Sequence, residues 1–161
     1  MCASCVKLMG ELCTILIVED SPDDLLLIRR ALDRGRIANP VHVVSDGEQA
    51  VSYLEGENEY ADRTRFPLPA LVLLDLRLPR KGGYEVLKWI RGHDQLSRLP
   101  VVVLSSSHAE NEIARAYDLG ANSYLVKPVS TDALIRLVQA MDFGWIRHAT
   151  PPPPPDARPM A

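Results

Sequence analysis

The stretch LVLLDLRLPRKGG, residues 71–83, decides the fold because it places a carboxylate at the end of an apolar run. Four apolar residues lead into Asp75, and Pro79 follows four residues later. A short apolar run without alternation, bounded by turn residues, is typical of a strand that is covered on both faces of a sheet. An ionised carboxylate at the end of such a strand is costly to bury unless another group compensates its charge. The residues that surround Asp75 in the fold must therefore supply that compensation.

The composition is that of an ordinary soluble domain. The chain has 161 residues, of which 47% are hydrophobic and 24% charged, enough for one domain with short extensions. A net charge of −3 argues against nucleic acid or an anionic membrane as the partner. No apolar run approaches the roughly 20 residues of a membrane span, and the first residues do not resemble a secretory signal. These features favour a cytoplasmic protein.

All three cysteines lie near the start of the chain, at Cys2, Cys5 and Cys13. The first two form a Cys-x-x-Cys pair, but no second pair completes a zinc site, so a reduced N-terminus is favoured over a metal or redox site. We expect a flexible extension over residues 1–11, a folded domain over 12–148 and a disordered proline-rich tail over 149–161. Docking of the polyproline segment on an aromatic groove of a partner is the alternative for the tail.

Short apolar runs alternate with stretches of helical periodicity along the domain. The predicted strands are 14–19, 41–44, 70–75, 100–105 and 123–126, and the predicted helices are 21–35, 47–56, 83–93, 109–120 and 130–143. Ser21 is a candidate N-cap for the first helix, and Gly120 is a candidate left-handed stop for the fourth. Five successive strand–helix units predict a doubly wound α/β domain, with a parallel five-stranded sheet and helices on both faces.

Polar residues follow the carboxyl ends of four of these strands, where ligands bind in open parallel sheets. They are Glu19 and Asp20 after the first strand, Asp75 on the third, Ser105, Ser106 and Ser107 on the fourth, and Lys127 with Pro128 after the fifth. In a sheet of order 2-1-3-4-5 the first and third strands are neighbours, so the three carboxylates would meet. Their mutual repulsion is relieved by a hard divalent cation such as Mg²⁺, which prefers oxygen ligands and leaves room for a phosphoryl group.

Each of these residues also has an ordinary structural interpretation. Asp20 could be a turn or cap residue, Lys127 a surface lysine, and the serines part of a polar loop. Their occurrence together at the matching ends of four strands favours a functional site over these separate roles.

The chain resembles the receiver domain of two-component response regulators over residues 14–146. The motifs that carry the resemblance are VEDSPDD (18–24), LLDLRLPRKGG (73–83), VVVLSSS (101–107) and AYDLGANSYLVKP (116–128). The segment GENEYADRTRF before the third strand and the ending DFGW resemble the small regulators that are paired with bacterial phytochromes and related histidine kinases. The resemblance implies a flavodoxin-like fold and phosphotransfer from a sensor histidine kinase.

By this resemblance Asp75 is the phosphoacceptor. Asp20 and Asp75 would ligate Mg²⁺ together with the backbone carbonyl of Arg77, and Glu19 would act directly or through water. Lys127 would pair with Asp75 or with the phosphoryl oxygens. Phosphoryl transfer depends mainly on in-line positioning and charge neutralisation, which such a site would supply.

The resemblance also implies a conformational switch. Ser105 would bind the phosphoryl group, Tyr124 would turn into the space that Ser105 vacates, and the Lys127–Pro128 peptide would be cis. The change would reach the face formed by the fourth helix, fifth strand and fifth helix. The family more often has threonine at the position of Ser105, and serine lacks the methyl group that restricts the rotamer, so we expect looser coupling.

Three further expectations concern function. A single-domain regulator would signal by contact, and Phe143, Trp145 and Ile146 near the end of the last helix could join two copies as a homodimer. An Mg²⁺-dependent phosphohydrolase is the enzyme alternative, but haloacid-dehalogenase-type enzymes have a second aspartate where this chain has Arg77. A receiver-like scaffold without phosphorylation is the third alternative, against which the presence of Glu19, Asp20, Asp75 and Lys127 argues.

Overall fold

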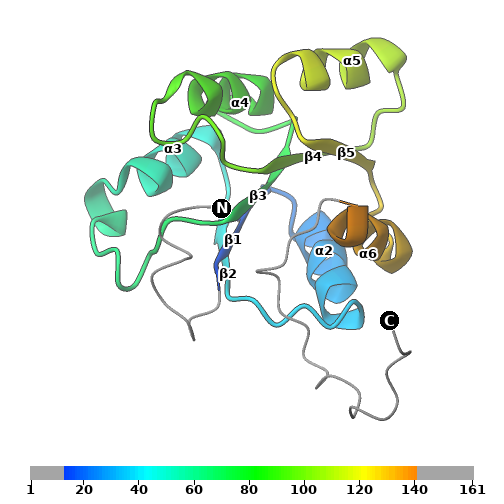
Figure 1. Ribbon diagram of the computed structural model, residues 1–161, viewed down its shortest axis with the longest axis horizontal. Helices are drawn as coiled ribbons and strands as arrows, with labels where there is room; N and C mark the ends of the chain where they lie inside the picture. The colour runs from blue at the N-terminus through cyan, green and yellow to red at the C-terminus, as the bar shows by residue number, and fades with distance from the viewer. Residues whose placement is uncertain (1–12, 141–161) are drawn as a thin grey trace, which may run out of the picture.

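Five parallel strands form the centre of the domain, in the order β2-β1-β3-β4-β5 (Figure 1). The computed structural model describes residues 13–140. The strands are β1 (Ile15–Val18), β2 (Val41–Val44), β3 (Leu71–Asp75), β4 (Val101–Ser105) and β5 (Ser123–Val126). The helices are α2 (Pro22–Arg34), α3 (Gly47–Glu55), η1 (Asn58–Tyr60), α4 (Gly83–Gly92), α5 (Glu110–Asp118) and α6 (Thr131–Ala140). The predicted doubly wound sheet of order 2-1-3-4-5 is confirmed.

Helices cover both faces of the sheet, which explains why the strand sequences show no alternation. Ile15 and Ile17 of β1 point toward one apolar cluster, in which Ile28 of α2 and Leu134 of α6 are also buried. Leu16 and Val18 point to the opposite cluster, which α3, α4 and α5 complete. Figure 1 shows α2 and α6 side by side on their face, with α4 and α5 on the other. Every position of β1, β3 and β4 is therefore buried.

The strand register aligns the residues at the carboxyl edge. Val18 pairs with Leu74, so Glu19, the next residue after β1, lies opposite Asp75. Asp75 pairs with Leu104, and Ser105 pairs with Val126, the residue before Lys127. One edge of the sheet therefore collects the polar residues of four strand ends.

The described helices begin and end within two residues of the predicted ones, and the predicted end of the last helix at residue 143 lies outside the described residues. Ser21 caps α2, because its hydroxyl accepts a hydrogen bond from the Asp24 amide at 3.3 Å, and Pro22 occupies the first turn. Gly120 follows α5 with a φ of 100°, in the left-handed region that favours glycine. The amide of the next residue, Ala121, returns to the carbonyl of Ala116 at 3.0 Å, which closes the end of the helix.

The segment between α3 and β3 is fixed to the domain by Arg63. Its guanidinium donates to the carbonyls of Tyr53 and Leu54, both at 2.7 Å, and to that of Phe66 at 3.2 Å. The carbonyls of Tyr53 and Leu54 belong to the last turn of α3, where the helix leaves carbonyls short of partners, and that of Tyr53 also accepts from the Gly56 amide at 3.2 Å. The segment thus forms part of the folded domain.

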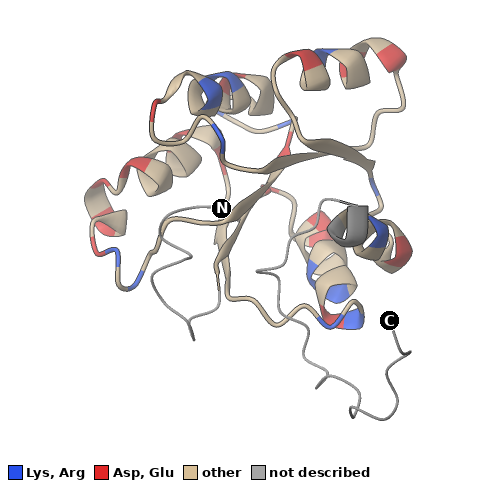
Figure 2. Ribbon diagram, in the orientation of Figure 1, with Lys and Arg blue, Asp and Glu red and all other residues tan. Residues whose placement is uncertain are grey.

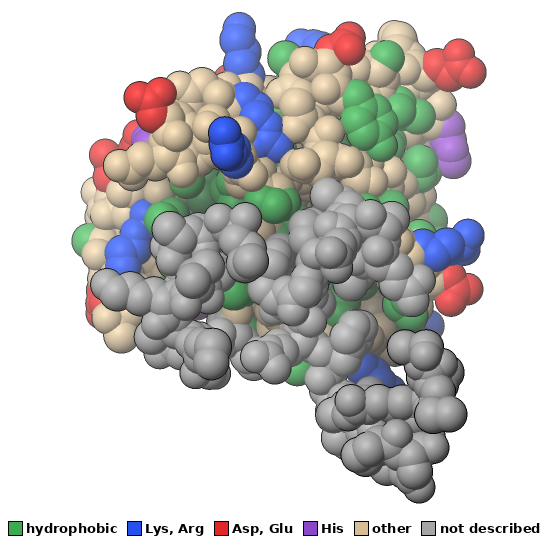
Figure 3. Space-filling model, in the orientation of Figure 1, with side chains coloured by type: hydrophobic (Ala, Val, Ile, Leu, Met, Phe, Trp, Pro, Cys, Tyr) green, Lys and Arg blue, Asp and Glu red, His purple; other side chains and the backbone are tan. Residues whose placement is uncertain are grey.

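Some predictions lie outside the described residues. They are the extension over 1–11, the tail over 149–161, the domain ends at residues 12 and 148, Cys2 and Cys5, and the trio Phe143, Trp145 and Ile146. Within residues 13–140 no helix has the length and apolar character needed to cross a bilayer. The helices α2, α4, α5 and α6 carry charged residues of both signs, whereas α3 carries only acidic ones (Figure 2). The part of the face that is visible in Figure 3 shows no large patch of one sign.

Candidate functional site

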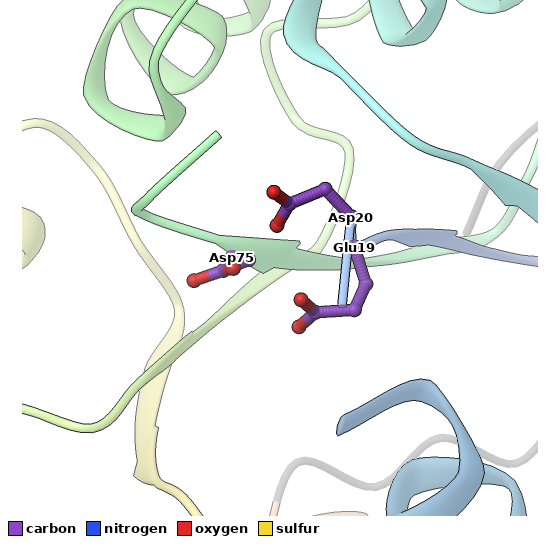
Figure 4. A group of neighbouring side chains, drawn as sticks. All are labelled: Glu19, Asp20 and Asp75. Carbon is purple, nitrogen blue, oxygen red and sulfur yellow. The ribbon is translucent and has the colours of Figure 1, made fainter. Parts of the chain in front are cut away.

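Three carboxylates meet at the carboxyl edge of the sheet, where β1 and β3 end (Figure 4). Oxygen atoms of Glu19, Asp20 and Asp75 all lie within 4.8 Å of one another. Glu19 and Asp75 are buried, at 2% and 4% exposure, whereas Asp20 is exposed. The structure therefore brings together the three acids that the sequence places at neighbouring strand ends, with one side open to solvent.

Lys127 is a largely buried cation that pairs with two of the three acids of this cluster. Its Nζ atom is 2.7 Å from Glu19 Oε2 and 3.3 Å from Asp75 Oδ2. The lysine side chain is 11% exposed, and the Glu19 side chain is fully buried. The resemblance implied that Lys127 pairs with Asp75 or with the phosphoryl oxygens; the ion pair with Asp75 is present, and that with Glu19 is shorter.

Sequence analysis missed one residue of this site. Asp24, in the first turn of α2, places Oδ2 at 3.0 Å from the Lys127 ammonium and is 35% exposed. Its spacing from Ser21 was the available signal, because a side chain three residues after the N-cap points back over the start of the helix. Sequence reasoning did not assign Asp24 to the site, since the approach of the first turn of α2 to Lys127 is a property of the tertiary fold.

Burial and pairing act in opposite directions on the charges of Glu19 and Lys127. Burial raises the pKa of Glu19, and hydrogen bonds from Lys127 and from the Ser21 amide, at 3.1 Å, offset only part of that rise. Burial alone would lower the pKa of Lys127, but the hydrogen bonds to Glu19 and Asp24 and the field of Asp75 outweigh it and raise that pKa. Lys127 therefore remains a cation at any physiological pH.

Asp20 is the acid that the lysine does not compensate. Within residues 13–140 it forms no ion pair, although its carboxylate lies against Glu19 and Asp75. Three carboxylates with one ammonium leave a net negative site, and its donors are all oxygen. Such a donor set suits a hard divalent cation that retains some of its water ligands.

The loop after β3 is held directly against Asp75. The Arg77 amide donates to Asp75 Oδ1 at 3.2 Å, and the Gly83 amide donates to the Leu76 carbonyl at 3.1 Å. A Cβ atom on Gly83 would overlap the Asp75 carbonyl oxygen and would lie 2.6 Å from Leu76 Cα. Gly83 is therefore required for the loop to approach the strand this closely. The Arg77 side chain is exposed, and the role of its carbonyl as a metal ligand stays a prediction.

The predicted switch residues are connected through the backbone of Ser107. Buried Ser105 accepts a hydrogen bond from the Ser107 amide at 3.2 Å, and the Tyr124 hydroxyl donates to the Ser107 carbonyl at 3.1 Å. The Lys127 amide donates to the Ser105 carbonyl at 2.8 Å, and the Lys127–Pro128 peptide is cis, as the resemblance implied. A movement of Ser105 would thus reach Tyr124 through one residue.

Comparison with known proteins identifies the family. The sequence pattern of the response regulator receiver domain matches residues 15–139. This chain belongs to that family. The receiver domain covers every described strand and helix except the last residue of α6.

Three relatives of this receiver domain are informative. Response regulator Rcp1 of Synechocystis sp. is 38% identical over 138 residues, which covers 86% of this chain and 92% of Rcp1. A solved structure of the Mn²⁺-bound form of Rcp1 covers 88% of this chain and 99% of its own, with a TM-score of 0.68. The bacteriophytochrome response regulator RtBRR is 42% identical, with a TM-score of 0.77 and coverage of 88% and 85%. The phosphorylated cyanobacterial phytochrome response regulator RcpA is 40% identical, with a TM-score of 0.69 and coverage of 83% and 94%.

Proposed function

We propose that this protein is a single-domain response regulator that accepts a phosphoryl group on Asp75 from a sensor histidine kinase. The observation that carries the proposal is the position of Asp75, at the end of β3, among Glu19, Asp20 and Lys127. In the transfer, the P–N bond of the donor phosphohistidine breaks as an oxygen of Asp75 forms the new P–O bond. The electron pair stays on the imidazole nitrogen, which then takes up a proton.

The cation that we propose for this site is Mg²⁺. Glu19, Asp20 and Asp75 would hold it together with the Arg77 carbonyl, and the Mn²⁺-bound form of the relative Rcp1 supports a divalent ion. The bound ion would neutralise charge on the phosphoryl oxygens. Lys127 would add a further positive charge beside the phosphoryl group, because its ammonium is already 3.3 Å from Asp75.

Phosphorylation would act on Ser105 first. The phosphoryl group adds up to two negative charges and new hydrogen-bond acceptors beside β4. A Ser105 hydroxyl that turned toward it would leave the Ser107 amide, and Ser107 also holds Tyr124. The population would then shift toward a packing with Tyr124 turned inward, which changes the face of α5, β5 and α6.

The partner that we propose is a phytochrome-type histidine kinase of the cytoplasm. Two of the relatives are described as a bacteriophytochrome response regulator and a cyanobacterial phytochrome response regulator, and the match covers 85% and 94% of their chains. We keep as part of this proposal a homodimer through Phe143, Trp145 and Ile146, which light scattering of the phosphorylated and unphosphorylated protein would test. Neither nucleic acid nor a membrane is needed for output by contact.

We propose a signalling protein rather than a phosphohydrolase. Arg77 stands two residues after Asp75 and exposes its side chain, so no carboxylate occupies the position where that enzyme class has its second aspartate. Only self-phosphorylation from small phosphodonors and slow loss of the phosphoryl group are expected. Turnover of unrelated phosphate esters by the protein would contradict this assignment.

The direct test is phosphorylation by acetyl phosphate with Mg²⁺, followed by phosphotransfer from each histidine kinase of the source organism. We expect one acid-stable, alkali-labile phosphate per chain, with none in Asp75→Asn and a normal amount in the control Asp33→Asn, which changes an exposed acid of α2. Labelling that persisted in Asp75→Asn would remove Asp75 from its role. A chain that took up no phosphate from acetyl phosphate or from any kinase would refute the proposal.

A further inference from the structure

The Lys127 ammonium is shared among three carboxylates from three different elements. Glu19 follows β1, Asp75 ends β3 and Asp24 lies in the first turn of α2, at 2.7, 3.3 and 3.0 Å from Nζ. The contacts with Glu19 and Asp24 are hydrogen bonds, whereas the contact with Asp75 is a longer ion pair. A phosphoryl group on Asp75 would add up to two negative charges beside the lysine and would draw its ammonium toward β3, in competition with one of the two hydrogen-bonded carboxylates.

The pair with Asp24 is the one that yields most readily. The Glu19 side chain is fully buried and has the shortest contact, so its loss would leave a buried charge without its cation. Asp75 would itself carry the phosphoryl group. The Asp24 side chain is 35% exposed, and water can solvate it once the lysine leaves. The hydrogen bond that costs least to break is thus the one to α2.

The geometry points to Asp24 as a positioning residue that holds Lys127 toward α2 before phosphorylation and releases it to the phosphoryl group afterwards. This inference rests on the proposed function, since it needs a phosphoryl group on Asp75. The consequence is that phosphorylation would change the structure along a second route, through α2, in addition to the route through Ser105 and Tyr124. The first turn of α2 loses a tie to the edge of β5 when the domain is phosphorylated, and that helix exposes Leu26 and Leu27 at 48% and 40%.

The neighbouring acid Asp23 provides a matched control. It lies in the same first turn, is exposed, and forms no ion pair with the described residues. Asp23→Asn removes the same charge from the same helix start and changes the helix dipole interaction equally, but it leaves Lys127 untouched. Any effect specific to Asp24→Asn therefore comes from its contact with the lysine.

The test uses the full chain with Mg²⁺ and beryllium fluoride, which imitates a phosphoryl group on a carboxylate. Affinity is measured by titration, and hydrogen exchange is followed at the amides of Asp24, Leu25, Ser107 and Lys127. In the wild type we expect beryllium fluoride to speed exchange at Asp24 and Leu25. Asp24→Asn should bind beryllium fluoride roughly two- to fivefold more tightly than Asp23→Asn, since the lysine is no longer shared with the Asp24 carboxylate.

Hydrogen exchange of the amides at the start of α2 shows whether Asp24 positions the lysine or only stabilises the helix. In Asp24→Asn the first-turn amides should exchange at the faster rate already without beryllium fluoride and should not respond to it, while Ser107 and Lys127 respond normally. Asp24→Glu, which keeps a carboxylate within reach of the lysine, should restore both wild-type affinity and the response.

Three results would overturn the inference, and they separate a failure of the role of Asp24 from a failure of the proposed function. Equal affinities for Asp24→Asn and Asp23→Asn, or a wild-type α2 that does not respond while Ser107 does, would refute the role of Asp24 alone. No response to beryllium fluoride at Ser107 or Lys127 in the wild type would refute the proposed function as well.

Discussion

Each end of the sheet has one positively charged side chain that joins several elements, but the groups that it contacts differ between the two ends. At the carboxyl end, Lys127 pairs with three carboxylates within 3.3 Å. At the amino end of β4 and β5, Arg91 of α4 donates to the carbonyls of Leu99 and Gly120 at 2.7 and 2.9 Å. It also donates to Asn122 Oδ1 at 2.9 Å, and the Val101 amide at the start of β4 shares that oxygen.

The difference separates a responsive site from a fixed one. Carboxylates around Lys127 raise its pKa, whereas burial lowers the pKa of Arg91, whose hydrogen bonds at this end of the sheet go to neutral dipoles. Three acids that compete for one ammonium can exchange it when a new anion arrives. Carbonyls fixed by the backbone cannot, so Arg91 holds the connections at the amino end in one arrangement. The chemistry and the mechanical support of the domain thus lie at opposite ends of the same strands.

The largest effect on stability is expected at Gly83, the first residue of α4, and Gly92 at the other end of the same helix is its control. Gly83→Ala should lower the free energy of unfolding by about 3 kcal/mol, because its Cβ atom would overlap the backbone of Asp75 and Leu76. Gly92→Ala, where the new Cβ atom meets nothing within 4 Å, should raise it by about 0.5 kcal/mol. Urea denaturation measures both. Equal and small effects would show that the loop after β3 is not tightly held against Asp75.

The next effect concerns support at the amino end. Arg91→Met keeps the aliphatic stem but removes the donors to Leu99, Gly120 and Asn122, and should cost about 2 kcal/mol of stability. Phosphorylation by acetyl phosphate should continue at its normal rate under conditions where the variant is folded. Arg98→Met, at an exposed position, is the control and should change stability by less than about 0.5 kcal/mol. Loss of phosphorylation in folded Arg91→Met would mean that the two ends are coupled.

The smallest effect is a gain in stability at the carboxyl end. Asp20 is the one of the three mutually repelling acids that does not pair with the lysine. Asp20→Asn removes its charge and should stabilise the metal-free protein by about 0.5 kcal/mol at low salt. The same change should weaken stabilisation by Mg²⁺, which thermal unfolding with and without the ion measures. Asp94→Asn, an exposed acid between α4 and β4, should do neither. A destabilised Asp20→Asn with an undiminished Mg²⁺ effect would contradict the excess of negative charge at this edge.

The sequence alone predicted the sheet and most of the residues at its edge. Glu19, Asp75 and Lys127 were predictable because strand ends in a parallel sheet meet at one edge, so order along the chain gives position in space. The ion pair between Asp24 and Lys127 was not predictable, because it depends on how the start of α2 lies relative to the residue that follows β5. The bonds of Arg91 also escaped prediction, since they join α4 to two connections whose paths no local pattern specifies.

The most direct test of the account is the location of the phosphoryl group. The protein is phosphorylated with acetyl phosphate and Mg²⁺, reduced with borohydride to convert an aspartyl phosphate to homoserine, and mapped by peptide mass spectrometry. We predict conversion at Asp75 alone, with Asp20 and Asp24 unchanged and no conversion when Mg²⁺ is removed by a chelator. Conversion at another aspartate, with Asp75 intact, would contradict the account.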